Sequence, residues 1–142
     1  MDDAGTDGGP AAMVERLRVA SNEHDLPALV GCFAADYRNE TPAHPERGFT
    51  GRDQVRRNWE QIFGFVPDVR AEVLRRAIDG DTVWTEWQMT GTRRDGTAHH
   101  MRGVVVFGVG GGVARWARFY LEPVDEGAGG VDDAVREQVV RG

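Results

Sequence analysis

The hydrophobic residues in the first half of the chain recur every three or four positions, which is the spacing of amphipathic helices. This spacing predicts helices over 11–22, from about 25 to 34, and over 51–63, with a short strand over 36–41. Asp25 is a favourable N-cap residue, and Pro27 falls in the first turn, where its missing N–H costs little. Pro42 ends the short strand because it cannot donate to a sheet ladder.

In the second half the hydrophobic residues alternate with polar ones, which is the period of β-strands. The alternation predicts strands over 68–79, 81–92, 97–109 and 112–122. Asp79-Gly80, Asp95-Gly96 and the glycine run over 110–112 are expected to form the hairpin turns between them. Three helices followed by a long antiparallel meander indicate the α+β class.

The length of 142 residues is that of one domain with a real hydrophobic core. We expect a disordered acidic, Gly-rich tail over 1–10, a globular domain over 11–125, and a C-terminal segment over 126–142 with a short helix over 132–140. No apolar stretch is long enough for a membrane span, and the first residues lack the basic-then-apolar pattern of a signal peptide. A cytoplasmic location, with no membrane partner, is therefore expected.

The net charge, the single cysteine and the positions of the histidines each argue against a class of partner or cofactor. The net charge of −6 argues against nucleic acid, which needs a basic surface stripe. Cys32 is the only cysteine, so neither an internal disulfide nor a cysteine-based metal site is possible. His99 and His100 are adjacent on a predicted strand and point to opposite faces, so they cannot chelate one metal ion. No metal and no other cofactor is predicted.

Two predicted strands combine aromatic and charged residues on one face. Alternation places Trp84 on the same face as Glu86, and Trp116 on the same face as Arg118 and Tyr120. Charged side chains are rarely buried unless they are paired or used. If both faces line one cavity, Glu86 is a candidate general base, and Arg118 would position it or bind an anionic oxygen of the substrate. The alternative is a structural salt bridge that fixes two strands.

Other residues are candidates for the same cavity. His99 shares a strand face with Met101 and would suit acid chemistry near neutral pH, unless it is only a histidine at the cavity rim. Tyr37 and Asn39 also share a face, where they would orient water or substrate; alternatively Tyr37 closes the core with its hydroxyl bonded to Asn39. The predicted substrate-binding residues are apolar or aromatic: Trp59, Phe63, Trp84, Met101, Trp116 and Tyr120.

The other face of the strand over 81–92 holds Val83, Thr85, Trp87 and Met89. This set is too apolar for open solvent. It predicts a homodimer in which a second copy covers the convex face of the sheet.

The order of elements, the Tyr37-x-Asn39 strand and the segment over 112–123 resemble the SnoaL-like group of the nuclear-transport-factor-2-like superfamily. This group includes polyketide cyclases, ketosteroid isomerases and limonene-1,2-epoxide hydrolases. The resemblance covers roughly residues 11–125. It implies a cone-shaped barrel in which three N-terminal helices pack on a strongly curved, mostly antiparallel sheet that encloses a cavity.

The resemblance also allows a comparison of catalytic positions. In the epoxide hydrolases the Tyr-x-Asn pair helps to hold the attacking water, and Tyr37 and Asn39 match that pattern. Those enzymes add an Arg-Asp-Asp set, for which this chain has Trp84, Glu86 and Arg118. Two members of the epoxide hydrolase set are therefore altered, and Glu86, which keeps a carboxylate, could face Arg118 as a pair with the partners exchanged.

The ketosteroid isomerase comparison gives no match, since Thr41 and Val105 stand where those enzymes have their two aspartates. Arg118 also takes the place of the carboxylate base of the SnoaL-type cyclases. The resemblance implies a cofactor-free acid–base enzyme, a cyclase, isomerase or hydrolase/hydratase, that acts on a hydrophobic small molecule. The alternative is a non-catalytic ligand-binding or dimeric accessory module of the same fold.

Overall fold

The computed structural model describes residues 9–127 and 129–140. Most of the predicted tail lies outside the described residues, and Pro10 already begins the first helix. The elements in chain order are α2 (Pro10–Asn22), α3 (Leu26–Val30), β1 (Phe33–Glu40), the 3-10 helix η1 (Pro45–Arg47), β2 (Phe49–Thr50), α4 (Arg52–Phe65), β3 (Arg70–Asp79), β4 (Thr82–Thr92), β5 (Ala98–Gly110), β6 (Val113–Pro123) and α5 (Val131–Val140).

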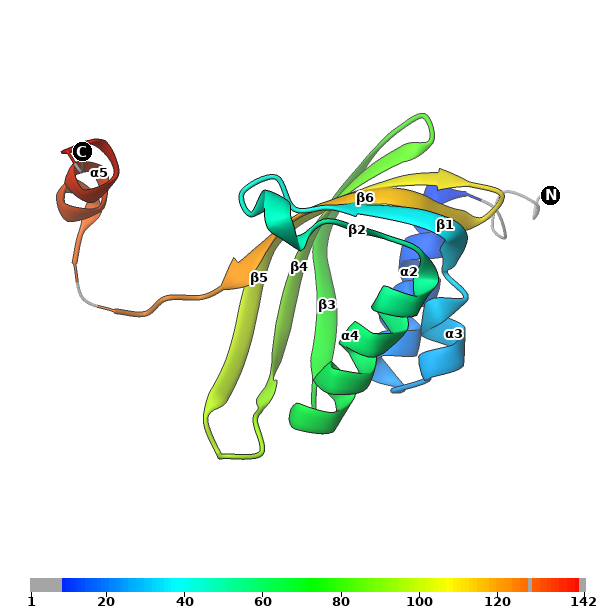
Figure 1. Ribbon diagram of the computed structural model, residues 1–142, viewed down its shortest axis with the longest axis horizontal. Coiled ribbons are helices and arrows are strands. Elements are labelled where there is room, and N and C mark those ends of the chain that lie inside the picture. The colour runs from blue at the N-terminus through cyan, green and yellow to red at the C-terminus, as the bar shows by residue number, and fades with distance from the viewer. Residues whose placement is uncertain (1–8, 128, 141–142) are drawn as a thin grey trace.

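The described strands form one six-stranded sheet in the order β2-β1-β6-β5-β4-β3. All neighbours are antiparallel except β1 and β6, which are parallel. The sheet curves around α2, α3 and α4, and it stays open because β2 and β3 are both edge strands (Figure 1). The α+β class and the cone-like arrangement predicted from the sequence are confirmed.

The four long strands match their predicted bounds closely, because hairpin turns punctuate them. Gly80 and Gly96 sit in two of these turns with positive φ values of 62° and 89°. Only glycine adopts that backbone conformation without strain, so the turn positions are fixed locally by the sequence.

The prediction for the second helix is wrong at its C-terminal end. α3 stops at Val30, and Phe33 and Ala34 belong to β1 instead. The Ala114 N–H of β6 donates to the Cys32 carbonyl at 2.8 Å, and Phe33 pairs with Ala114. Strand pairing therefore takes over a segment whose apolar spacing also fits a helix.

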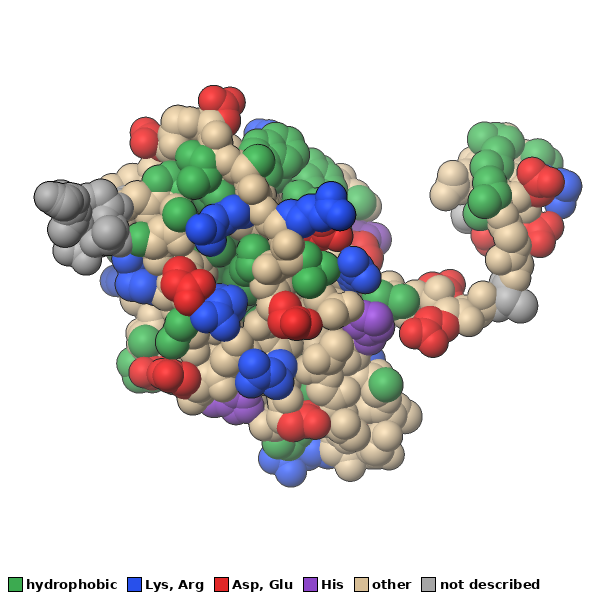
Figure 2. All heavy atoms as spheres, turned by 180° about the vertical axis from the view of Figure 1, so that it is seen from behind, with side chains coloured by type: hydrophobic (Ala, Val, Ile, Leu, Met, Phe, Trp, Pro, Cys, Tyr) green, Lys and Arg blue, Asp and Glu red, His purple; other side chains and the backbone are tan. Residues whose placement is uncertain are grey.

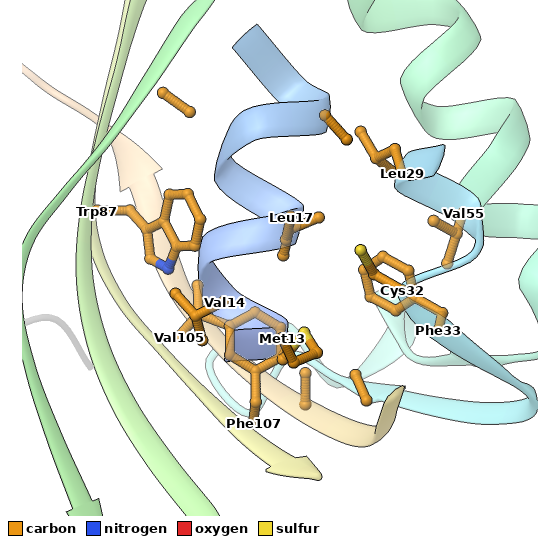
Figure 3. Packing of buried hydrophobic residues seen from close by; sticks show 14 of the residues in the cluster. Met13, Val14, Leu17, Leu29, Cys32, Phe33, Val55, Trp87, Val105 and Phe107 are labelled. Atoms are coloured by element: carbon orange, nitrogen blue, oxygen red, sulfur yellow. The ribbon is translucent and has the colours of Figure 1, made fainter. Parts of the chain in front are cut away.

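The core lies between the helices and the concave face of the sheet (Figure 3). Met13, Val14 and Leu17 of α2 pack there against Trp87 of β4 and Phe107 of β5. Burial of these side chains is the main source of the stability of the domain.

The predicted orientation of β4 is wrong. The apolar set of this strand is buried inside the protein, so it does not form the convex face that a second copy would cover. Its members are Val83, Thr85, Trp87 and Met89. The indole N–H of Trp87 donates to Thr85 Oγ1 at 2.7 Å, and that hydroxyl donates to the Val105 carbonyl at 2.6 Å. The apolar set is covered by the helices of its own chain, with its one hydroxyl and its indole N–H satisfied internally.

The C-terminal helix stands apart from the body of the protein (Figures 1 and 2). Every residue of α5 is exposed, including Val131, Val135 and Val139 along one side. Within the described residues, no helix combines the length and the apolarity needed to cross a membrane.

Candidate functional site

A cavity of about 310 Å³ opens on the concave side of the sheet, between α4, the segment after β1, and strands β5 and β6. Much of its wall is hydrophobic, with Phe33, Trp59, Met101, Phe119 and Leu121 among the lining residues. Its polar side chains are Tyr37, Asn39, Thr41, Arg47, Asn58, His99 and Glu122. A mainly apolar cavity with a few polar groups is the usual form of a small-molecule site.

Tyr37 and Asn39 lie on the cavity wall, and both are almost fully buried. The Tyr37 hydroxyl donates to Asn39 Oδ1 at 2.7 Å, and Asn39 Nδ2 donates to Thr41 Oγ1 at 3.4 Å. Burial raises the pKa of Tyr37 far above its ordinary value, so the phenol stays protonated and acts as a donor. The three side chains form a polar strip along one wall.

His99 is the one imidazole on the cavity wall. Its ring is half-buried and makes no hydrogen bond or ion pair with any described residue. Burial lowers the pKa of His99, and the nearby charge of Arg93 and that of His100 lower it further. His99 is therefore neutral at pH 7 and has a free lone pair available to accept a proton.

His100 occupies the opposite face of β5, as strand alternation requires. Its Nε2 lies 3.1 Å from Gln88 Oε1, and its Nδ1 lies 3.9 Å from the Glu126 carboxylate. The two adjacent histidines therefore have different surroundings, and only His99 reaches the cavity.

The predicted Glu86–Arg118 pair inside the cavity is wrong. Both residues lie on the outer face of the sheet, where neither contributes to the cavity wall. Glu86 is 3.8 Å from Arg75 Nε and 3.6 Å from Arg102 Nη2. Arg118 Nε donates to Glu40 Oε1 at 2.7 Å, which lowers the pKa of the Glu40 carboxyl.

The reason for this error is the choice of face. On β6 the inward set is Ala117, Phe119 and Leu121, and the register shift opposite Gly108 and Val109 lets Ala114 be buried as well. Arg118 then points outward, with its guanidinium carbon 5.5 Å from the centre of the Trp116 ring.

The aromatic candidates divide between the two sides of the sheet. Trp59 and Met101 line the cavity. Phe63 stacks on His24, with ring centroids 4.5 Å apart, and packs beside Trp59 without lining the cavity.

The predicted pocket positions of Trp84, Trp116 and Tyr120 are wrong. Trp84 is 51% exposed and Tyr120 is 43% exposed, both on the outer face. Trp116 lies on that face too, over Gly108, whose missing side chain leaves room for the indole ring.

Four polar residues of the cavity were not predicted as site residues: Thr41, Arg47, Asn58 and Glu122. Asn58 could have been found, since it follows Val55 by three positions on the inward face of α4. Arg47 gives no such signal, because its position depends on how the segment between β1 and β2 folds. Glu122 is engaged by His44, whose Nε2 lies 3.2 Å from Glu122 Oε2.

The site offers one neutral imidazole, several N–H donors and a hydrophobic volume. No group of three or more His, Cys, Asp or Glu side chains in residues 9–127 and 129–140 is arranged to hold a metal ion. The chemistry that these side chains support is proton transfer to and from an apolar molecule, with donors available to hold its oxygen atoms.

Comparison with solved structures shows the same fold in other proteins. A protein from Catenulispora acidiphila DSM 44928 with a ketosteroid isomerase-like fold, in complex with trimethylamine, is 21% identical, with a TM-score of 0.64 over 79% of this chain and 86% of that one. A proposed SnoaL-like polyketide cyclase from Shewanella putrefaciens CN-32 is 11% identical, with a TM-score of 0.67 over 79% of each chain. A proposed ketosteroid isomerase from Kribbella flavida DSM 17836 is 22% identical, with a TM-score of 0.64 over 92% of this chain and 86% of that one.

No curated protein sequence matches the chain. The sequence profile of the SnoaL-like domain, however, matches residues 14–119, a range that runs from the middle of α2 into β6. It includes almost all of the core, five of the six strands in full and almost all of the cavity wall. This chain belongs to the SnoaL-like family.

Proposed function

We propose that the protein binds a hydrophobic small molecule in this cavity and performs cofactor-free acid–base chemistry on it. The reaction would be a cyclisation, an isomerisation or a hydration. The observation that carries the proposal is His99, a neutral imidazole with a free lone pair on the wall of a mainly apolar cavity. The family match supports it, since the fold neighbours include a proposed polyketide cyclase and a proposed ketosteroid isomerase.

In this proposal His99 is the general base. Its lone pair accepts a proton from the bound substrate or from an attacking hydroxyl group, and the resulting imidazolium returns that proton to the product. No oxidant or reductant is needed, because His99 returns the proton that it takes; a hydration also consumes one water molecule, which adds to the substrate. Asn39 holds the substrate or a water molecule through its amide, while the Tyr37 hydroxyl fixes the orientation of that amide.

Glu86 and Arg118 have no part in this mechanism. Both are on the outer face of the sheet, with partners of their own in Arg75, Arg102 and Glu40. A substrate in the cavity would not touch either side chain.

The test is a comparison of two neighbouring histidine variants. Epoxides, aromatic polyketide lactones, steroids and terpenoid acids would first be screened for binding by thermal shift, and binders would then be assayed for turnover. His99→Gln should lower kcat by about 10²- to 10⁴-fold while substrate affinity changes little. His100→Gln is the matched control on the opposite face of β5, and it should keep wild-type kcat. Full turnover by His99→Gln would contradict the assignment.

The alternative is a binding module without catalysis. It is favoured by the lack of a free carboxylate on the described cavity wall, where the only acidic side chain, Glu122, is engaged by His44. Under this alternative, a compound from the screen would bind in the cavity and be recovered unchanged from the wild-type protein.

We also propose that two copies pair through the convex face of the sheet, although not through the residues first expected. Trp84 and Tyr120 are each at least 43% exposed there, with arginine and acidic side chains among them. Sedimentation velocity should show a dimer that Trp84→Glu converts to a monomer. Val139→Glu, on the exposed side of α5, is the control and should leave the dimer intact. A wild-type monomer at tens of micromolar would contradict this proposal.

A further inference from the structure

The cavity wall holds N–H donors that have no acceptor among the residues that the structure describes. The Arg47 guanidinium makes no hydrogen bond or ion pair with any described residue, and neither does the indole N–H of Trp59. Asn58 accepts a bond from Gln54 Nε2 at 2.8 Å through its Oδ1, which leaves both hydrogens of its own amide nitrogen unused.

The side-chain acceptors on the same wall are already engaged, except for the lone pair of His99. Asn39 Oδ1 accepts from the Tyr37 hydroxyl at 2.7 Å, and Thr41 Oγ1 accepts from Asn39 Nδ2 at 3.4 Å. The two carboxylate oxygens of Glu122 lie 3.3 Å and 3.2 Å from His44 Nε2. The donors therefore outnumber the free acceptors, and they include a positive charge.

The unused donors come from two segments that are close in sequence, η1 and α4. Arg47 ends η1 and is exposed, so it stands at the mouth, while Asn58 and Trp59 are consecutive residues of α4 and less exposed. Much of the wall that β5 and β6 contribute is apolar, with Met101 from β5 and Phe119 and Leu121 from β6. A molecule that satisfies both parts of the wall needs an apolar body and oxygen acceptors at one end.

We infer that the ligand of this cavity is a hydrophobic carboxylic acid, bound as its carboxylate. The Arg47 fork matches a carboxylate with two parallel N–H···O bonds, and the Asn58 amide supplies a further donor. The apolar body then lies against Met101 and Phe119, next to His99. This inference rests on the proposed function only in that the cavity must take a small molecule; it holds for an enzyme and for a binding module alike.

The test is calorimetric titration with three probes that share one ring system and differ in charge. These are naphthalene-2-carboxylate, its methyl ester, and the naphthalen-2-ylmethylammonium ion. We expect the carboxylate to bind about fivefold to tenfold more tightly than the ester, since a hydrogen bond to a partly exposed charge gives a gain of that size. The ammonium ion should bind more weakly than the ester.

Arg47→Gln should remove the advantage of the carboxylate and leave ester binding unchanged. Arg56→Gln is the matched control, because Arg56 is an exposed arginine of α4 that does not line the cavity. Raising the NaCl concentration from about 0.05 M to about 0.5 M should weaken the binding of the carboxylate and leave the binding of the ester unchanged. This is the effect that screening predicts for an interaction with an exposed arginine. The indole N–H resonance of Trp59 should shift on binding, and that of Trp84, on the outer face, should not.

Each outcome separates this inference from the proposed function. Equal affinity for ester and carboxylate, with the Trp59 shift, would overturn the carboxylate inference and leave cavity binding intact. An equal loss of affinity for the carboxylate and the ester in Arg47→Gln would overturn it too, because the role of the arginine would then be structural. Failure of all three probes to bind would overturn it as well, while the wider screen with His99→Gln would still decide the proposed function.

Discussion

The inward orientation of β4 can be tested by replacing Thr85 with valine. Thr85 is almost fully buried, and its hydroxyl both accepts from the Trp87 indole at 2.7 Å and donates to the Val105 carbonyl at 2.6 Å. Valine has nearly the same shape, but its side chain can neither accept nor donate a hydrogen bond. If the strand had the opposite orientation, Thr85 would be on the outer face and the change would be close to neutral.

The expected loss of stability follows from the two hydrogen bonds. An indole N–H left buried without an acceptor costs about 1–3 kcal/mol, and the lost bond to the carbonyl costs about 0.5–1.5 kcal/mol. The extra methyl group offsets about 0.8 kcal/mol. The net loss is about 2 kcal/mol. With an unfolding entropy of about 2.1 cal/mol/K per residue over 142 residues, this lowers Tm by about 7 °C.

The measurement is equilibrium unfolding in urea and by calorimetry, at one fixed protein concentration because a dimer would make Tm concentration-dependent. Thr85→Ser keeps the hydroxyl and should lose only about 1 kcal/mol for the missing methyl group. Thr90→Val is the same change on the exposed face of β4 and should stay within about 0.5 kcal/mol of the wild type. A Thr85→Val protein as stable as Thr90→Val would refute the orientation of the strand.

Three further predictions concern charge and the C-terminal helix. Because burial lowers the pKa of His99, the unfolded chain binds a proton at this residue more readily than the folded protein does. The stability that His99 contributes is therefore present above about pH 6.5 and is lost as pH falls through the folded pKa. The free energy of unfolding, measured in urea from pH 8 to pH 5, should fall less steeply in His99→Gln than in His100→Gln. Arg118→Ala should leave the free energy of unfolding close to that of the wild type, because its pair with Glu40 is exposed; a clear loss of stability by urea titration would contradict this. Removing the residues after Gly127 should leave Tm within about 2 °C of the full chain, since every residue of α5 is exposed; a larger drop in calorimetry would mean that the helix docks on the protein in solution.

The strands were predictable because their signals are local. Alternating residues and turn glycines such as Gly80 and Gly96 act within a few positions, and the structure places the long strands within two residues of the predicted ranges. The end of α3 was not predictable in the same way. Phe33 continues a helical spacing, but it pairs with Ala114, which is about eighty residues away in sequence. Pairing over such a distance leaves no local signal.

Alternation divides a strand into two sets without saying which set faces inward. On β4 both sets contain a tryptophan, and the aromatic side chains around Glu86 suggested a pocket. The competing set, Val83, Thr85, Trp87 and Met89, is the less polar one, and it is buried. Comparing the polarity of the two sets would have chosen the correct face, since a glutamate is seldom buried when an apolar alternative exists.

The cavity residues found from the sequence limit the chemistry that the proposed function allows. Tyr37, Asn39 and His99 all lie on the cavity wall, and with Glu86 outside it, the only free base there among the described residues is an imidazole whose pKa is lowered. A base this weak removes a proton from carbon at a useful rate only when neighbouring carbonyl groups have already made that proton acidic. The negative charge that develops then lies on oxygen, where the unused N–H donors of Asn58 and Trp59 would stabilise it. Under the proposed function, a substrate with an activated C–H bond between carbonyl groups therefore fits this cavity better than an unactivated hydrocarbon or a simple epoxide.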